Sequence, residues 1–213
     1  MQLIIGNHNY SSWSLRAWLL LRQFELEFET VRIAPFTPGS AELIRGYNPA
    51  GKVPVLLDNT LTVWDSLAIC EYISEQYLHG QGWPAAKDLR AHARSSCAEM
   101  HTGFMALRHA LPMNCRRTVE NFTISAEVQQ DIDRIIQLWS EALRLSGSEQ
   151  FLYGEFSITD AFYAPVAFRL TGYGVRLPAQ LQAYCERVLA LPACQEWLKL
   201  AQQENEVIEE EEV

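Results

Sequence analysis

Long hydrophobic runs are missing from the sequence. No apolar stretch approaches the roughly 18 to 20 residues that a membrane-spanning helix needs. The opening residues, Met-Gln-Leu-Ile-Ile, lack the basic region and the long apolar region of a signal peptide. We therefore expect a cytoplasmic protein with no membrane partner. Phosphate-binding loops, zinc-ligand spacings and Ser-His-Asp signatures are also missing, so no metal site is predicted.

Cysteines and basic residues are few. The five cysteines are an odd number without a Cys-x-x-Cys pair, which favours reduced and mostly buried thiols. The 17 Lys and Arg residues are outnumbered by 26 Asp and Glu residues, and the net charge of -9 arises mainly from glutamates near the C-terminal end. Because the basic residues are scattered rather than arranged in a stripe, we expect no nucleic-acid partner.

The remaining composition is that of a packed globule. Hydrophobic residues make up 48% of the 213 residues and charged residues 20%, which argues against intrinsic disorder. This length accommodates one large domain or two small ones.

The first part of the chain alternates short apolar runs with helical patterns. Apolar runs around Asp58-Asn59-Thr60 have the turn chemistry of a hairpin, and Asp65 or Ser66 is a suitable cap for the helix that follows. Ser40 is likewise a candidate helix cap. The expected elements are a strand at 2–5, a helix at 13–24, a strand at 28–33, a helix at 40–47, a hairpin from 53 and a helix over 67–77. The order βαβαββα is therefore predicted for a domain over residues 1–79.

The second part of the chain has no strand pattern. Two glycines and Pro84 predict a linker over 80–86, and the rest reads as an all-helical domain over 87–206. Helices are predicted at roughly 87–110, 125–145, 159–170, 178–190 and 192–206. Ser157-Ile-Thr-Asp160 has the spacing of a capping box. The acidic tail over 207–213 is expected to be frayed and solvated, because its glutamates repel one another.

Three segments together resemble a known family. They read Tyr10-Ser-Ser-Trp-Ser-Leu-Arg16, Asn48-Pro-Ala-Gly-Lys-Val-Pro-Val-Leu56 and Asp65-Ser-Leu-Ala-Ile-Cys-Glu-Tyr-Ile73. Their order and spacing resemble the cytosolic glutathione S-transferases of the serine type, nearest to the zeta-like bacterial branch. The resemblance implies an α/β thioredoxin-like N-terminal domain, an all-α C-terminal domain and a homodimer. It also implies a detoxification enzyme with glutathione as co-substrate and no permanently bound cofactor.

The resemblance implies a glutathione site at several matched positions, apart from the catalytic serine. Val53 would pair its backbone with the cysteinyl part, as an added strand does, ahead of a Pro54 that the family has in cis. From periodicity alone the trans bond is the commoner expectation. Ser66 at a helix start would bind the γ-glutamyl carboxylate. Asp65, one methylene shorter than the family's usual Glu or Gln, would face the ammonium, and Lys52 would face the glycyl carboxylate or only solvent.

The catalytic candidates are Ser11 and Ser12, because a serine hydroxyl can donate a hydrogen bond to a bound thiolate. Ser11 is favoured by its spacing to Arg16 and by its match to the first serine of the zeta class Ser-Ser-Cys motif. Trp13 stands where that class has cysteine and is expected to border the glutathione. Its presence counts against maleylacetoacetate isomerase activity and against thiol-transferase chemistry of the omega type.

Other polar residues have less specific roles in this interpretation. Arg16 is predicted to be structural, tying the first helix to the second domain, with anion binding as the alternative. The residues His101, Arg108, His109, Arg116 and Arg117 are expected to be solvent-facing or packed rather than functional.

The expected function is transfer of glutathione to a small hydrophobic electrophile. The alternatives are a glutathione-dependent isomerase or peroxidase, and a non-catalytic glutathione-binding module.

Overall fold

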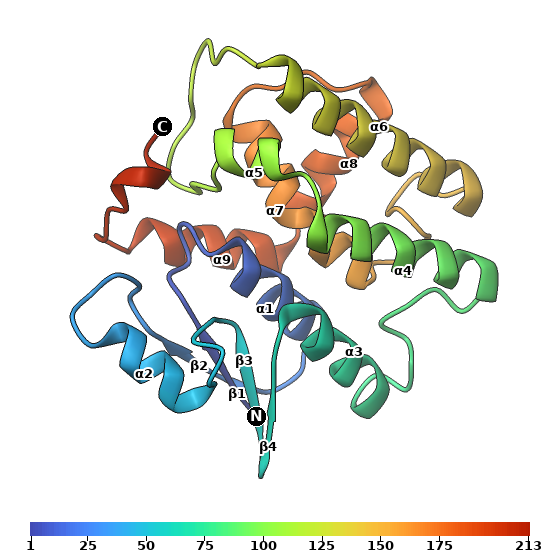
Figure 1. The fold of residues 1–213 in the computed structure, drawn as a ribbon. Coiled ribbons are helices and arrows are strands. Elements are labelled where there is room, and N and C mark those ends of the chain that lie inside the picture. The colour runs from blue at the N-terminus through green and yellow to red at the C-terminus, as the bar shows by residue number, and fades with distance from the viewer.

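The computed structural model describes all 213 residues, and Figure 1 shows a sheet in one half of the molecule and helices in the other. The strands are β1 (Gln2–Ile5), β2 (Glu29–Arg32), β3 (Val55–Asp58) and β4 (Leu61–Val63). Their order is β2-β1-β3-β4, with β1 parallel to β2 and antiparallel to β3, and with β3 antiparallel to β4. With α1 (Ser12–Gln23), α2 (Ser40–Tyr47) and α3 (Ser66–Gln76), this is the predicted order βαβαββα.

The two faces of β1 bury different clusters because side chains alternate along a strand. Leu3 and Ile5 join a continuous core of 48 buried residues that extends into the helical half. Ile4 faces the other way, into a small cluster with Ile33, Ile44 and Val55 beneath α2. The sheet is therefore covered on both faces, as the run Leu-Ile-Ile suggests.

The second half of the chain contains only helices. They are α4 (Lys87–Thr102), α5 (Met105–Ala110), α6 (Ala126–Ser146), α7 (Ile158–Gly172), α8 (Ala179–Leu189) and α9 (Pro192–Gln202), followed by the short 3-10 helix η1 (Glu209–Glu211). Helix α1 joins the halves, since it packs against α3 on one side and against α7 and α9 on the other (Figure 1). The mixed sheet with its helical second half confirms the predicted architecture. None of the helices has the length and apolar character needed to cross a bilayer.

Several helix ends differ from the predictions. The helix expected over 87–110 is interrupted, because Phe104 adopts a left-handed backbone (φ 61°) and Arg108 donates its Nε to the Gly103 carbonyl at 2.9 Å. A Cβ on Gly103 would lie 2.9 Å from the Glu99 carbonyl oxygen, so this close turn requires glycine. Helix α2 has Gly39 rather than Ser40 at its cap position, and α9 ends at Gln202 instead of 206.

The acidic tail is anchored through Glu212 rather than frayed, so that part of the prediction was wrong, whereas residues 207, 209, 210 and 213 are exposed, as a solvated tail requires. The Glu212 carboxylate accepts hydrogen bonds from the Tyr10 hydroxyl and, at 2.9 Å, from the Asn114 amide. It also lies 3.5 Å from Arg117 Nη1. These contacts offset the repulsion between neighbouring glutamates, which sequence reasoning considered without any partner.

All five cysteines are free thiols, and Cys70, Cys97, Cys185 and Cys194 are buried, as predicted. Burial raises the pKa of each of these four thiols, so they are poor nucleophiles.

Candidate functional site

The loop after β1 brings Ser11 to the start of α1. Ser11 is half-buried and occupies the cap position of the helix, but its side chain makes no capping bond. Its Oγ instead donates to Ser14 Oγ at 2.7 Å. Ser14 is fully buried, and its Oγ also accepts the Gly6 N–H at 3.2 Å. Two serine hydroxyls one helical turn apart are thus linked to a backbone amide.

Gly6 sets the spacing between Ser11 and the loop before β3. A Cβ at this position would lie 3.2 Å from both Ser11 Cβ and Ser11 Oγ, and 3.5 Å from Val53 Cγ2. A side chain here would therefore press on both residues, and glycine permits the close approach. The Val53–Pro54 peptide bond is cis, with Val53 half-buried and Pro54 buried. Gly6 thus brings Ser11 close to Val53, the residue that precedes the cis proline.

Ser12 faces the helical half of the molecule. It is 6% exposed, and its Oγ accepts a hydrogen bond of 3.3 Å from Arg169 Nη2 on α7. Arg169 also donates to the backbone carbonyls of Arg108, at 3.2 Å, and Leu111. Ser11 and Ser12 are adjacent in the chain, yet Ser11 lies at Gly6 beside Val53 whereas Ser12 bonds to α7.

Trp13 is 36% exposed and lies against two arginines. The Arg16 guanidinium lies 4.3 Å from the centre of the Trp13 ring and 4.6 Å from that of Phe162, and the Arg108 guanidinium lies 5.0 Å from Trp13. These are cation–π distances. Arg16 is fully buried, and none of its side-chain nitrogens has a hydrogen-bond partner. Burial, assisted by repulsion from Arg108, lowers the pKa of Arg16 to about 9, so the group remains cationic at neutral pH.

The start of α3 presents a carboxylate and a hydroxyl. Asp65 is the helix cap, with Oδ1 accepting the Leu67 N–H at 2.9 Å, and its Oδ2 lies 3.1 Å from His101 Nε2 on α4. Burial lowers the pKa of His101 although Asp65 opposes this, so the contact is chiefly a hydrogen bond at neutral pH. The Ser66 hydroxyl is fully buried without a partner. Capping by Asp65 is one of the two predicted alternatives.

The remaining predicted residue, Lys52, is exposed on the loop before Val53. Its carbonyl accepts a 3.2 Å hydrogen bond from the Asn48 side chain, which fixes the loop without engaging the ammonium group.

Sequence reasoning missed several residues of this region. His101 was expected to be unremarkable, yet it contacts Asp65 and lies 5.2 Å, ring to ring, from Trp13. Arg108 was treated in the same way, although it stacks on Trp13. Both lie on helices far along the chain, and no local pattern marks them. Ser14 had a usable signal, because its spacing of three residues from Ser11 places the two hydroxyls on one helix face.

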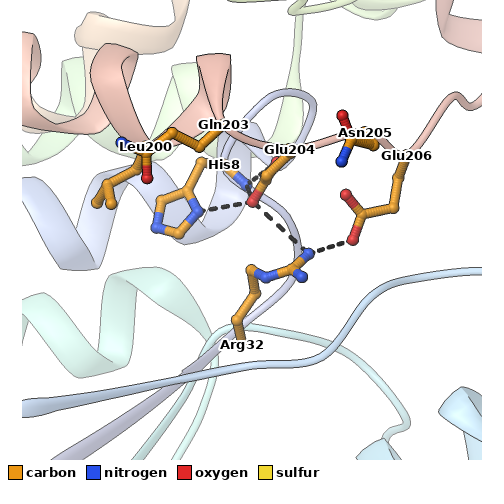
Figure 2. Close-up of a pocket in the computed structure, with 7 residues that line it drawn as sticks. All are labelled: His8, Arg32, Leu200, Gln203, Glu204, Asn205 and Glu206. Atoms are coloured by element: carbon orange, nitrogen blue, oxygen red, sulfur yellow. Dashed lines mark hydrogen bonds and ion pairs between the residues drawn. The ribbon is translucent and has the colours of Figure 1, made fainter.

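A polar cavity of about 590 Å³ lies outside this cluster, at the ends of β1 and β2 (Figure 2). It is lined by His8, Arg32, Leu200, Gln203, Glu204, Asn205 and Glu206. Figure 2 shows Glu204 between His8 and Arg32, with His8 Nδ1 2.7 Å from the Glu204 carboxylate. Because the lining contains none of the predicted glutathione residues, we regard this region as a junction between the two halves of the chain. The structure contains no cluster of three or more His, Cys, Asp or Glu side chains that could hold a metal ion.

Comparison with known proteins identifies the family. The model described as "Glutathione S-transferase, N-terminal domain" matches residues 10–76, and "Glutathione S-transferase, C-terminal domain" matches residues 122–200. Together they cover more than half of the chain. The chain therefore belongs to the glutathione S-transferase family, as its motifs predicted, and the fold agrees with that assignment.

The sequence identity to individual relatives is low or limited to part of the chain. A dichloromethane dehalogenase from Methylophilus leisingeri is 35% identical over 79 residues, which are 36% of this chain and only 30% of that protein. A probable maleylacetoacetate isomerase from Vibrio cholerae is 27% identical over 91% of this chain and 94% of its own length. Among solved structures, a glutathione transferase homolog from Burkholderia with bound glutathione has a TM-score of 0.72 at 24% identity, covering 95% of this chain and 98% of that one. This last likeness concerns the fold.

Proposed function

We propose that the protein binds glutathione beside Ser11 and Val53 and transfers it to a small hydrophobic electrophile. The Ser11 hydroxyl donates to the sulfur and stabilises its anionic form, while the Val53 backbone pairs with the cysteinyl part of glutathione. At the start of α3, Ser66 binds the γ-glutamyl carboxylate and Asp65 the ammonium. Lys52 reaches the glycyl carboxylate, and Trp13 borders the bound peptide. Glutathione enters as a co-substrate.

The observation that carries this proposal is the packing of Ser11 and Val53 against Gly6, beside a cis proline and at the amino end of α1. A free thiol has a pKa of about 8.5 and is mostly protonated at neutral pH. A hydrogen bond from Ser11 and the helix dipole both favour the thiolate. The cationic Arg16, packed under Trp13, contributes potential of the same sign.

We further propose a cytoplasmic homodimer. The free thiols fit a reducing compartment. Leu61 and Trp64, which are 45% and 47% exposed, lie on and beside the edge strand β4, where a second copy would cover them. Sedimentation of the protein with Trp64→Glu should show more monomer than the unaltered chain.

The decisive test compares Ser11→Ala with Ser12→Ala. If Ser11 is the donor, Ser11→Ala lowers kcat at neutral pH by about tenfold or more, with a smaller loss of glutathione affinity. Thiolate absorbance of the bound tripeptide, followed against pH, measures the underlying shift. A larger effect of Ser12→Ala would reassign the role. Absence of glutathione binding by calorimetry would refute the proposal as a whole.

An isomerase is the second candidate, supported by the full-length similarity to the probable maleylacetoacetate isomerase of Vibrio cholerae. Trp13, in place of the zeta class cysteine, argues against it. Product analysis separates the reactions: a glutathione conjugate indicates transfer, unchanged glutathione with rearranged substrate indicates isomerisation, and oxidised glutathione indicates peroxide reduction.

A further inference from the structure

We propose that Ser14 is a positioning residue for the glutathione thiol and that it acts through Ser11. In this arrangement a chain of hydrogen bonds begins at the Gly6 amide, passes through the Ser14 and Ser11 hydroxyls and ends at the sulfur. The inference rests on the proposed function, in which Ser11 donates to that sulfur.

The geometry leaves the Ser14 hydroxyl few other roles. Ser14 is 0% exposed, and its side-chain contacts are the Gly6 N–H at 3.2 Å and Ser11 Oγ at 2.7 Å. A serine in the first turn of a helix commonly bonds to local backbone groups of that helix. Here Ser14 instead reaches across to the end of β1 and behind Ser11. The Gly6 amide is a fixed donor, so it orients one lone pair of Ser14 Oγ permanently.

Two proton arrangements follow from this geometry. In the free protein Ser11 donates to Ser14. When a thiolate lies beside Ser11, the Ser11 proton turns to the sulfur, and the Ser14 proton, free because Gly6 is the donor on its other side, turns to Ser11 Oγ. Ser11 then accepts one hydrogen bond while donating another. Successive bonds of this kind polarise one another and strengthen by roughly 10–30% each.

No proton is transferred to either serine. The thiol proton leaves to solvent, the sulfur keeps the electron pair, and both hydroxyls remain neutral donors. Ser14 never touches the sulfur, and its contribution is to keep Ser11 Oγ supplied with a hydrogen bond while Ser11 donates.

The experiment is a double-mutant cycle read as the pKa of the bound glutathione thiol. The variants are Ser14→Ala, Ser11→Ala and the two combined, each saturated with glutathione and titrated by thiolate absorbance. Ser14→Ala should raise the thiol pKa by about 0.3 to 1 unit and lower kcat at neutral pH, while the affinity measured well below the pKa of the bound thiol, where the protonated form binds, changes less than about twofold. In the Ser11→Ala background the same substitution should cause no further shift.

A matched control is Ser96→Ala, which removes another buried serine hydroxyl, bonded to Tyr163 on α7. This variant should change stability and leave the thiol pKa unaltered. An unchanged thiol pKa in folded Ser14→Ala, or an equal shift with and without Ser11, overturns the inference. If Ser14→Ala does not fold, Ser14→Cys carries the test, since a thiol is a weaker donor of similar shape; it should give a smaller shift, and no shift overturns the inference.

Failure of the proposed function has a different signature. In that case the thiol pKa is not depressed in the unaltered protein, or Ser11→Ala leaves it where it was. A normal response to Ser11→Ala with none to Ser14→Ala rejects only the role of Ser14.

Discussion

At the residue scale, Ser66 is a buried side chain whose hydrogen-bonding capacity is unused. Its hydroxyl is buried at the first residue of α3 and has no hydrogen-bond partner. Leaving such a group unsatisfied costs about 1–3 kcal/mol. A ligand carboxylate at this helix start would recover that cost, and the helix dipole favours a negative charge there.

Ser66→Ala should therefore separate binding from stability. We expect the variant to bind glutathione about tenfold more weakly in calorimetry, while its Tm stays equal or rises because an unsatisfied hydroxyl is gone. Ser74→Ala is the matched control, since Ser74 lies on the same helix with a buried hydroxyl that also has no partner. If both variants bind glutathione as the unaltered chain does, Ser66 is not part of the site.

The motif around Ser66 was readable because a helix cap and its first turn are local. Asp65 or Ser66 could be named as the cap from sequence alone, and Asp65 fills that position. The partner of Asp65, His101, could not be named, because it lies on α4, a separate helix that begins only at Lys87, and is positioned by packing. The same holds for Arg169 beside Ser12.

At the scale of elements, α7 begins at a complete capping box. The predicted capping box is present, with Asp160 Oδ2 accepting the Ser157 N–H at 2.9 Å. Asp160 is fully buried and also accepts hydrogen bonds from the Leu152 N–H, at 3.2 Å, and the Tyr184 hydroxyl, at 3.1 Å. One carboxylate thus ties α7 to the preceding loop and to α8, which the box pattern alone does not indicate.

Asp160→Ala should be strongly destabilising, by about 3 kcal/mol or more, because four buried donors, among them the Ser157 hydroxyl, lose their acceptor. Chemical denaturation at neutral pH measures the loss. Asp88→Ala is the control, because Asp88 is an exposed residue in the first turn of α4. This substitution should lower the free energy of unfolding by less than about 1 kcal/mol. Similar losses of stability for the two variants would mean that the buried hydrogen bonds of Asp160 add no stability beyond that of an exposed carboxylate.

The loss of stability in Asp160→Ala should depend on pH, and the direction of this dependence follows from the pKa of Asp160. Burial raises the pKa of Asp160 to about 6 despite its hydrogen bonds. The folded state therefore binds this proton more tightly than the unfolded chain, so the contribution of Asp160 to stability grows as pH falls from about 6 towards 4. The difference in the free energy of unfolding between the unaltered protein and Asp160→Ala should increase as pH falls over that interval.

Elements were more predictable than their ends. The strand and helix order followed from apolar periodicity, whereas the break after α4 depends on how Arg108 folds back onto the Gly103 carbonyl. The packed tail depends on Tyr10, Asn114 and Arg117. The tail contacts join positions about a hundred or more residues apart, and a local pattern contains no information about them. The Arg108 contact spans only five residues.

At the scale of the whole molecule, Glu204 fastens the end of the helical half to the loop after β1. Its carboxylate accepts hydrogen bonds from the backbone N–H groups of His8, at 2.8 Å, and Asn9, at 3.0 Å. It also lies 2.7 Å from Nδ1 of the His8 ring. Arg32 lies 3.7 Å away. Burial alone would raise the pKa of Glu204, but these hydrogen bonds outweigh it and hold the pKa below its usual value.

Glu204→Gln should lower the free energy of unfolding by about 2–4 kcal/mol at neutral pH, because a buried charged acceptor is replaced by a neutral amide. Since the folded pKa is depressed, this stabilisation is present above the ordinary glutamate pKa and is lost as pH falls through the folded value. Glu196→Gln is the control, because Glu196 forms an exposed pair with Arg22 at 2.7 Å and should change stability by less than about 1 kcal/mol. Equal losses would contradict the role of Glu204.

The bond between Glu204 and residues 8 and 9 also orders events during synthesis. The last strand and helix of the sheet half are complete once Gln76 has been made, but the loop that leads to Ser11 receives its clamp only when Glu204 leaves the ribosome. At about 5–20 residues per second, the nascent sheet waits roughly 6 to 26 seconds for it. A chain whose translation stops short of Glu204 would carry every side chain that we propose binds glutathione and still lack the clamp that holds the loop before Ser11 in place.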